Sequence, residues 1–237
     1  MDIEQARQNM VLQQIRPWGV HDERVLALMA SLPREEFVPL HWRNLAFADT
    51  PLPLLADAAA ARDAGQVMLP PCMQARMAQE LNIAPHEKVL HIGTGSGFMA
   101  ALLGGLAQRV ISAELDETLA QRAQENLART GTLNVHVRAA DGLKVALEDG
   151  PFDAILLSGS VLAVPDALIY QLSASGRLLA IVGDEYAMRA TLLRRTTGGA
   201  NTIQPWDATA PRLRGHLAAN AAVVDGLALP EEATIPQ

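Results

Sequence analysis

The sequence contains few cysteines, few aromatic residues and no arrangement typical of a metal site. Cys72 is the only cysteine among 237 residues, which excludes an intramolecular disulfide framework and a cysteine-rich zinc cluster. This cysteine usage is typical of a reducing cytoplasm, and a lone cysteine at the start of a helix more often packs than reacts. The six histidines form no H-E-x-x-H motif and no i, i+4 pair, so we predict no metal.

Long apolar runs and an excess of positive charge are also missing. No stretch approaches the roughly 20 apolar residues of a membrane span, and the acidic start MDIEQARQNM does not resemble a signal peptide. The net charge of −7 argues against a nucleic-acid-binding surface, which needs clustered lysine and arginine. We therefore expect a cytoplasmic protein with neither a membrane nor a nucleic-acid partner. The sequence leaves the oligomeric state open.

The most informative stretch is KVLHIGTGSG, residues 88–97. An apolar run at 88–92 stops at Gly93, Gly95 and Gly97, and a helix-like segment and a second apolar run ending in Glu114 follow. This order predicts a strand, a tight glycine turn, a helix over 97–107 and a strand over 109–114. Glu114 follows Gly93 by roughly 20 residues, the spacing that places an acid on ribose hydroxyls.

The glycine spacing helps to choose the ligand. A dinucleotide site usually has G-x-G-x-x-G, but here the sixth position is Phe98 and the third glycine comes one residue early. The pattern G-x-G-x-G is more similar to the S-adenosylmethionine loop of Rossmann-like methyltransferases, and it disfavours a nicotinamide dehydrogenase. The alternative is a glycine turn in an α/β domain that binds no ligand.

Apolar periodicity predicts alternating strands and helices in the rest of the chain. We expect further helices at 2–15, 22–31, 72–83, 117–130 and about 165–173, and further strands at 134–138, 152–157, 177–182 and about 189–196. Residues 56–65 fit either a short helix or a loop, and the signal fades beyond residue 200. The expected fold is α/β, with a mostly parallel doubly wound sheet and an N-terminal helical extension. We divide this one compact domain into a cleft-covering segment (1–84), an α/β core (85–217) and a C-terminal tail (218–237).

Ligands of open α/β sheets bind at the carboxyl ends of the strands. At these ends Glu114 is expected to bind a ribose diol, Asp141 an adenine amino group, and Ser158 and Ser160 face what lies beyond the cofactor. The alternative is that these are solvated acids and ordinary loop serines. The predicted cofactor-binding residues are His91, Gly93, Thr94, Gly95, Ser96, Gly97, Glu114, Leu115, Asp141 and Gly142.

No Ser/His/Asp order, carboxylate pair or activated lysine stands out in the sequence. Methyl transfer from a sulfonium to an ionised carboxylate needs alignment and exclusion of water more than a strong base, so this absence fits such a reaction.

Several segments together resemble protein-L-isoaspartate (D-aspartate) O-methyltransferases, a family that marks damaged aspartyl residues for repair. The resemblance covers roughly residues 9–215. It is carried by MVLQQIRPWGVHDERVLALMASLPREEFVP, LAFADTPLPL, Gly65-Gln66, VLHIGTGSGFMAALL and FDAILLSGSVLAVPDALIYQLSASGRLLAIVG. It implies a Rossmann-like class I methyltransferase fold, S-adenosyl-L-methionine as cofactor and proteins with isoaspartyl residues as substrates.

The same resemblance identifies departures at the substrate loop. The family pattern has Thr-Ile-Ser after Gly-Gln, and the resemblance implies that its serine holds the substrate carboxylate. This chain has Val67 and Leu69 where the two hydroxyl residues stand. His91 replaces an acid of the first core strand, and Phe47 replaces a tyrosine. The substrate-loop candidates are Gln66, Val67, Leu69, Ser158 and Ser160, and no catalytic residue is assigned. Alternative functions are a methyltransferase of this fold with a different acceptor, or a non-catalytic descendant that binds the cofactor.

Overall fold

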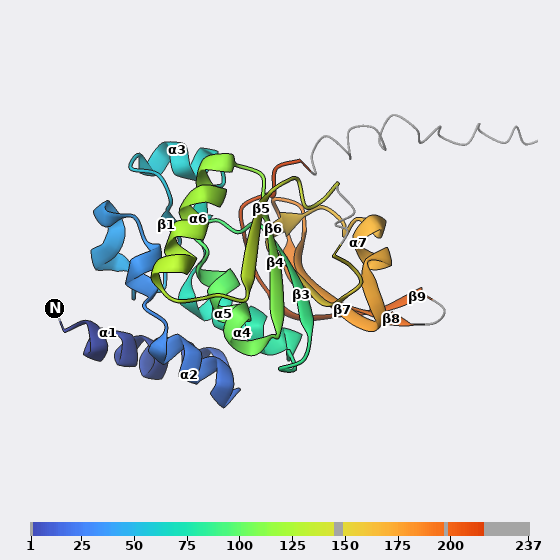
Figure 1. Cartoon of the computed structure of the whole chain (residues 1–237), viewed down its shortest axis with the longest axis horizontal. Coiled ribbons are helices and arrows are strands. Elements are labelled where there is room, and N and C mark those ends of the chain that lie inside the picture. Colours follow the sequence, from blue (N-terminus) through green and yellow to red (C-terminus); the bar gives the residue numbers. More distant parts are fainter. Residues whose placement is uncertain (1, 145–148, 197–198, 216–237) are drawn as a thin grey trace, which may run out of the picture.

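The computed structural model describes residues 2–144, 149–196 and 199–215 (Figure 1). The C-terminal tail predicted over 218–237 lies outside these residues. One seven-stranded sheet, with strand order β5-β4-β3-β6-β7-β8-β9, organises the described chain. Its strands are β3 (Lys88–Ile92), β4 (Arg109–Glu114), β5 (Val135–Ala139), β6 (Phe152–Val161), β7 (Leu172–Gly183), β8 (Met188–Thr196) and β9 (Gly199–Asp207).

The sheet is parallel from β5 to β7, and β8 and β9 complete it in antiparallel pairing. The expectation of a mostly parallel sheet is confirmed. The chain builds β3, β4 and β5 in one direction and then crosses to the other side of β3 for β6. The strand order therefore reverses between β3 and β6, and their carboxyl ends border the crevice where such sheets bind ligands.

Side chains on alternate positions of the central strands enter two separate clusters of buried residues. Val89 packs on one face of the sheet, with helices α4 (Pro71–Leu81), α5 (Phe98–Leu106) and α6 (Glu117–Arg129). Leu90 packs on the other face, which the short helix α7 (Asp166–Tyr170) covers. Figure 1 shows α4, α5 and α6 on the opposite side of the sheet from α7. Helices on both faces explain why the central strands are almost continuously apolar.

The N-terminal segment contributes to the same core. It contains α1 (Ile3–Met10), a π-helical turn η1 (Val11–Ile15), α2 (Glu23–Ser31) and the 3-10 turns η2 (Arg16–Trp18), η3 (Arg34–Phe37) and η4 (Leu40–Leu45). The helix predicted over 2–15 is therefore an α-helix followed by a π-helical turn. Met10 and Met29 belong to the buried cluster that includes Leu102 of α5. The division at residue 84 thus does not separate two hydrophobic cores.

A small second sheet borders the crevice. Strands β1 (Leu52–Pro53) and β2 (Val67–Met68) pair antiparallel, and the helix α3 (Ala58–Asp63) lies between them in the chain. Asp57 caps this helix, since its side chain accepts hydrogen bonds from the backbone N–H groups of Ala59 and Ala60. The segment 56–65, which fits either a helix or a loop in the sequence, is therefore a short capped helix.

Three predicted boundaries in the C-terminal half are wrong: the end of the helix at 165–173, the end of the strand at 152–157, and the start of the strand at 177–182, which begins at Leu172. The helix predicted at 165–173 ends at Tyr170, because Leu172 already pairs with Phe152 in the sheet. Strand β6 continues beyond residue 157 to Val161. Beyond residue 200, where the sequence gives little signal, β9 pairs with β8. Within the described residues, no helix is both long and apolar enough to cross a membrane.

Candidate functional site

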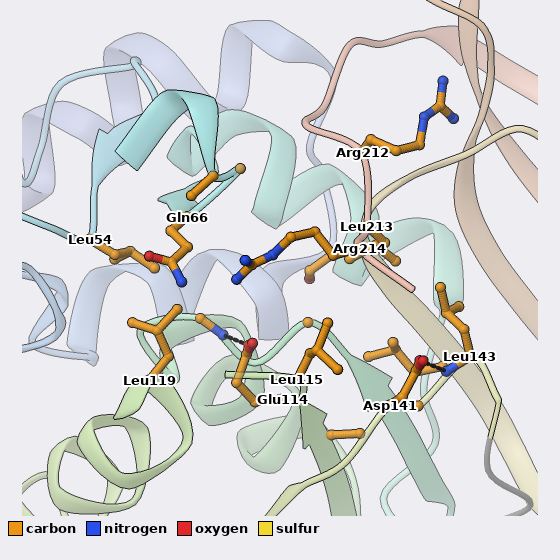
Figure 2. A pocket seen from close by; sticks show the side chains of 18 of the residues that line it. Leu54, Gln66, Glu114, Leu115, Leu119, Asp141, Leu143, Arg212, Leu213 and Arg214 are labelled. Atoms are coloured by element: carbon orange, nitrogen blue, oxygen red, sulfur yellow. Dashed lines mark hydrogen bonds between the residues drawn. The ribbon is translucent and has the colours of Figure 1, made fainter. Parts of the chain in front are cut away.

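An open pocket of about 620 Å³ lies at the carboxyl ends of β3, β4, β5 and β6 (Figure 2). Its floor is the glycine loop together with the strand ends. Its sides come from distant segments: the turn before β2, the start of α6, the turn after β5 and residues 212–214. The predicted site residues that line it are Gln66, Val67, Gly93, Gly95, Glu114, Leu115, Asp141, Gly142 and Ser158.

The glycine loop has a backbone conformation that other residues rarely adopt. Gly93, Gly95 and Gly97 have φ angles of 87°, 54° and 89°. A Cβ atom on Gly97 would lie 3.3 Å from the backbone oxygen of Ala123, so this glycine lets α5 and α6 pack closely. A Cβ atom on Gly95 would meet Leu54 at 3.2 Å. The loop therefore leaves bare backbone at the floor of the pocket.

Glu114 ends β4 beside this loop and is buried. Its Oε2 accepts a hydrogen bond from the Gly95 N–H at 2.8 Å, and its Oε1 accepts one from the Asp116 N–H at 3.1 Å. A carboxylate has about four acceptor positions, so two remain for a ligand. The carboxylate is thus fixed by two backbone donors and still able to accept hydrogen bonds from hydroxyl groups.

Asp141 and Leu115 lie on the other side of the pocket. The Asp141 side chain accepts a hydrogen bond from the Leu143 N–H at 3.1 Å and pairs with Lys144 at 3.2 Å. Leu115 has 44% of its surface exposed, and Leu143 lines the same region. A Cβ atom on Gly142 would lie 2.9 Å from that of Ala113, so this turn packs directly on the strand ends. An acceptor between the exposed Leu115 and the buried Leu143 suits a flat heteroaromatic amine.

Three polar side chains meet at the mouth of the pocket. The Gln66 side-chain amide donates to Asp116 Oδ2 at 2.9 Å, and Arg214 lies 3.9 Å from the same oxygen. The backbone N–H of Leu119 holds the pKa of Asp116 below its usual range. Figure 2 shows Gln66 and Arg214 extending toward each other from opposite sides. These contacts connect the turn before β2 to the segment after β9.

A smaller pocket of about 250 Å³ adjoins the glycine loop beneath β2. Val67, Gly93, Gly95 and Ser158 line both pockets. Leu69 lines the smaller pocket but not the larger one, and so do Thr94 and Ser96. The two pockets therefore border each other at the glycine loop, Val67 and Ser158.

His91 does not lie where the sequence-based interpretation placed it. It is completely buried inside the sheet and does not line either pocket. Its Nδ1 is 2.9 Å from the Ser112 hydroxyl, and its Nε2 is 2.7 Å from the Ser158 hydroxyl. Both ring nitrogens are thus engaged within the protein, which contradicts a direct contact with the cofactor. Burial lowers the pKa of His91 to about 3, so its ring is neutral at pH 7.

Two other polar residues predicted to bind the cofactor also form hydrogen bonds within the protein. The Thr94 hydroxyl is 2.6 Å from that of Ser112, and the Ser96 hydroxyl accepts a hydrogen bond from the Phe98 N–H. Ser160 is completely buried and lines neither pocket, so it does not face an acceptor. Its hydroxyl has no partner within the described part of the chain.

Arg34 is completely buried and contacts the segment that follows β2. Its guanidinium donates to the carbonyl oxygens of Ala46 and Leu69 and to the side chain of Gln74, and it stacks 4.7 Å from the ring centre of Phe98. Burial lowers the pKa of Arg34 to about 9. This arginine therefore holds the segment after β2 against the first turn of α5.

Cys72 is packed among hydrophobic side chains. It is buried in the core at the start of α4, and burial raises the pKa of its thiol. This agrees with a structural cysteine. Among residues 2–144, 149–196 and 199–215, no group of three or more His, Cys, Asp or Glu residues is arranged to hold a metal ion.

The sequence analysis missed several lining residues, among them Leu54, Leu119, Leu143, Arg212, Leu213 and Arg214. Leu213 covers the loop from above, because a Cβ atom on Gly93 would lie 3.1 Å from its side chain. Leu119 could have been found from its place in the first turn after Asp116. Nothing in the sequence points to Leu213 or Arg214, since they lie beyond the last predicted strand.

The described geometry agrees with what the chain resembles among known proteins. The family model for protein-L-isoaspartate(D-aspartate) O-methyltransferase matches residues 6–209. A protein-L-isoaspartate O-methyltransferase from Methanoculleus marisnigri is 41% identical over 197 residues, which cover 83% of this chain and 86% of the relative. A second relative of that name, from Marinobacter nauticus, is 42% identical over 191 residues, which cover 81% and 84%.

A solved structure shares the fold. A Plasmodium falciparum protein-L-isoaspartate O-methyltransferase in complex with S-adenosyl-L-homocysteine aligns with a TM-score of 0.72 and 21% identity. The alignment covers 88% of this chain and 98% of that one. The matched family model and the two relatives establish that the chain belongs to the protein-L-isoaspartate (D-aspartate) O-methyltransferase family.

Proposed function

We propose that this chain is an S-adenosyl-L-methionine-dependent methyltransferase that methylates the carboxylate of isoaspartyl residues in damaged proteins. The observation that carries the proposal is Glu114, which two backbone N–H groups hold beside a bare glycine loop in a pocket of about 620 Å³. Family membership supports the same activity. The proposed protein substrate and the buried, unpaired Cys72 fit a cytoplasmic location.

The residues of the larger pocket fit the proposed cofactor. Glu114 has acceptor positions left for the ribose hydroxyls, and Asp141 has an acceptor for the adenine amino group. Leu115 and Leu143 supply apolar contact for the adenine ring. When bound, the cofactor supplies a methyl group that its positive sulfur activates. In this proposal the residues that hold it are Gly93, Gly95, Glu114, Leu115, Asp141, Gly142 and Leu143.

The protein's contribution to the chemistry is positioning. A free carboxyl group has a pKa of about 3.9, so the acceptor is already a nucleophile at pH 7 and needs no general base. The neutral ring of His91 adds no positive charge behind the site. Leu54 and Leu213 lie next to the glycine loop, and apolar side chains there would help a bound substrate to exclude water.

A methyl-transfer assay tests this function. The purified chain is incubated with cofactor carrying a labelled methyl group and with a peptide that contains one isoaspartyl residue, and the same peptide with normal aspartate is the control. We expect base-labile label in the isoaspartyl peptide alone. Absence of label in both peptides, although the cofactor binds, would refute the repair activity.

A methyltransferase with a different acceptor is the second candidate. The apolar side chains of Val67 and Leu69 line the smaller pocket and favour a less polar acceptor edge. Cofactor turnover in a cell extract without turnover of the isoaspartyl peptide would support this candidate. Tight cofactor binding without any turnover would instead support a non-catalytic descendant.

A further inference from the structure

Ser158 occupies the boundary between the two pockets. Of the four residues that line both, it is the one with a polar side chain. The pairing of β6 with β7 is interrupted between Leu156 and Ser160, and Ser158 lies in this irregular stretch. Such interruptions re-aim side chains that would otherwise follow the strand's alternation. Here the half-buried Ser158 lines both pockets from inside a sheet strand.

A chain of buried side chains continues behind this hydroxyl. Ser158 Oγ is 2.7 Å from His91 Nε2, and His91 Nδ1 is 2.9 Å from Ser112 Oγ. Ser112 Oγ is in turn 2.6 Å from Thr94 Oγ1 in the glycine loop. His91, Ser112 and Thr94 are almost fully buried. Water therefore does not compete for the hydrogen bonds among His91, Ser112 and Thr94, and each bond polarises the next.

Because the His91 ring is neutral, the hydrogen bonds of this series can run in either of two directions. A neutral ring has one donor and one acceptor nitrogen, so either His91 donates to Ser158 or Ser158 donates to His91. A carboxylate can only accept hydrogen bonds. A carboxylate bound at Ser158 therefore selects the direction in which Thr94 donates to Ser112, Ser112 to His91 Nδ1, and His91 Nε2 to Ser158. The Ser158 hydrogen then points outward.

We propose that Ser158 donates the hydrogen bond that holds the acceptor carboxylate, and that the chain Thr94–Ser112–His91 orients its hydroxyl. This inference rests on the proposed function and names a residue for it. The family resemblance places a carboxylate-binding serine where this chain has Leu69, and the Ser158 hydroxyl supplies a donor within the same small pocket. His91 then acts as a positioning residue inside the sheet.

Peptide binding tests the inference without relying on turnover. The affinity of a short isoaspartyl peptide is measured by calorimetry on protein saturated with S-adenosyl-L-homocysteine. Loss of one charge-assisted hydrogen bond predicts that Ser158→Ala binds the peptide about ten- to hundredfold more weakly. Ser158→Thr keeps the hydroxyl and should stay within about threefold of the parent. Ser160→Ala is the matched control, because it removes a hydroxyl from the same strand outside both pockets.

All three variants should bind S-adenosyl-L-homocysteine like the parent, which checks that the cofactor site is folded. If Ser158→Ala binds the isoaspartyl peptide as tightly as the parent, the inference is overturned and the proposed function stands. If the parent itself does not bind the peptide, the proposed function fails and the inference fails with it.

Nitrogen-15 NMR of the His91 ring gives a second readout, which a purely structural serine would not change. In the peptide complex we expect the proton on Nε2. A proton on Nδ1 in that complex would mean that Ser158 donates inward to His91, and it would overturn the assignment.

Discussion

Replacing Glu114 with glutamine probes the proposed ribose site with a change of a few atoms. In the parent protein both carboxylate oxygens accept backbone hydrogen bonds, from Gly95 at 2.8 Å and from Asp116 at 3.1 Å. A glutamine amide has one oxygen and one NH₂ group. Whichever way the amide is turned, its NH₂ group faces one of these two N–H donors and leaves it unpaired.

The magnitude follows from one lost charge-assisted hydrogen bond in a buried position. Such a bond contributes about 1.5–3 kcal/mol, so the free energy of unfolding of the ligand-free variant should fall by about this amount. If the carboxylate also binds the ribose, a second loss of about this size appears in the affinity for S-adenosyl-L-homocysteine. That loss corresponds to a Kd about ten- to hundredfold higher.

Urea denaturation measures the change in the free energy of unfolding, and calorimetry measures the change in the Kd for S-adenosyl-L-homocysteine. Glu117→Gln is the control, since it removes the same charge from an exposed position in the first turn of α6. It should change either quantity by less than about 0.5 kcal/mol. An unchanged Kd for Glu114→Gln would refute the placement of the ribose, and an unchanged stability would refute the two backbone hydrogen bonds.

The remaining predictions concern four other positions. Gly95→Val should abolish binding of S-adenosyl-L-homocysteine, because φ is 54° and the new side chain would enter the pocket beside Leu54; near-parental affinity by calorimetry would contradict this. Leu69→Ser should raise turnover of an isoaspartyl peptide about tenfold in the labelled-methyl assay, and no rise in a folded variant would point to another acceptor. Because the unfolded His91 ring takes up a proton below pH 6.5 and the buried ring does so only near 3, the free energy of unfolding should fall by about 2 kcal/mol between pH 7 and 5 from this residue. His91→Gln should lack this contribution in denaturant titrations at the two pH values, and an equally steep fall would argue against a neutral buried ring. The buried thiol of Cys72 should react with maleimide only after unfolding, so rapid labelling of the native protein would contradict its packing.

The parallel half of the fold was predictable because each strand carries its own local signal. The run before Gly93 and the run ending in Glu114 are apolar, bounded by turn residues, and buried on both faces of the sheet. Strand β9, residues 199–207, was not predicted because its exposed polar residues show little hydrophobic pattern. It forms because the edge of β8 is available for pairing. This is a tertiary contact, which the local sequence of β9 does not specify.

Site residues were predictable where a polar side chain directly follows the end of a strand. They were not predictable where segments distant in the sequence meet. Glu114 and Asp141 line the pocket because parallel strands bring their carboxyl ends to one edge of the sheet. His91 was assigned to the cofactor from its place in the motif, but side chains alternate along a strand and this one points into the interior. Arg214 enters the pocket through the path of the chain after β9, which no local pattern specifies.

The buried guanidinium of Arg34 limits which parts of the crevice can rearrange. It donates to the Leu69 carbonyl and stacks on Phe98, so the segment after β2 and the first turn of α5 share one anchor. Shifting either by more than a hydrogen-bond length would strand a cation in the interior, at a cost of about 1–3 kcal/mol or more. The turn ending at Gln66 and the stretch around Arg214 meet through solvent-facing contacts that break at little cost. We therefore expect that a bulky polypeptide substrate displaces the turn ending at Gln66 and the stretch around Arg214, while the segments anchored by Arg34 keep their positions.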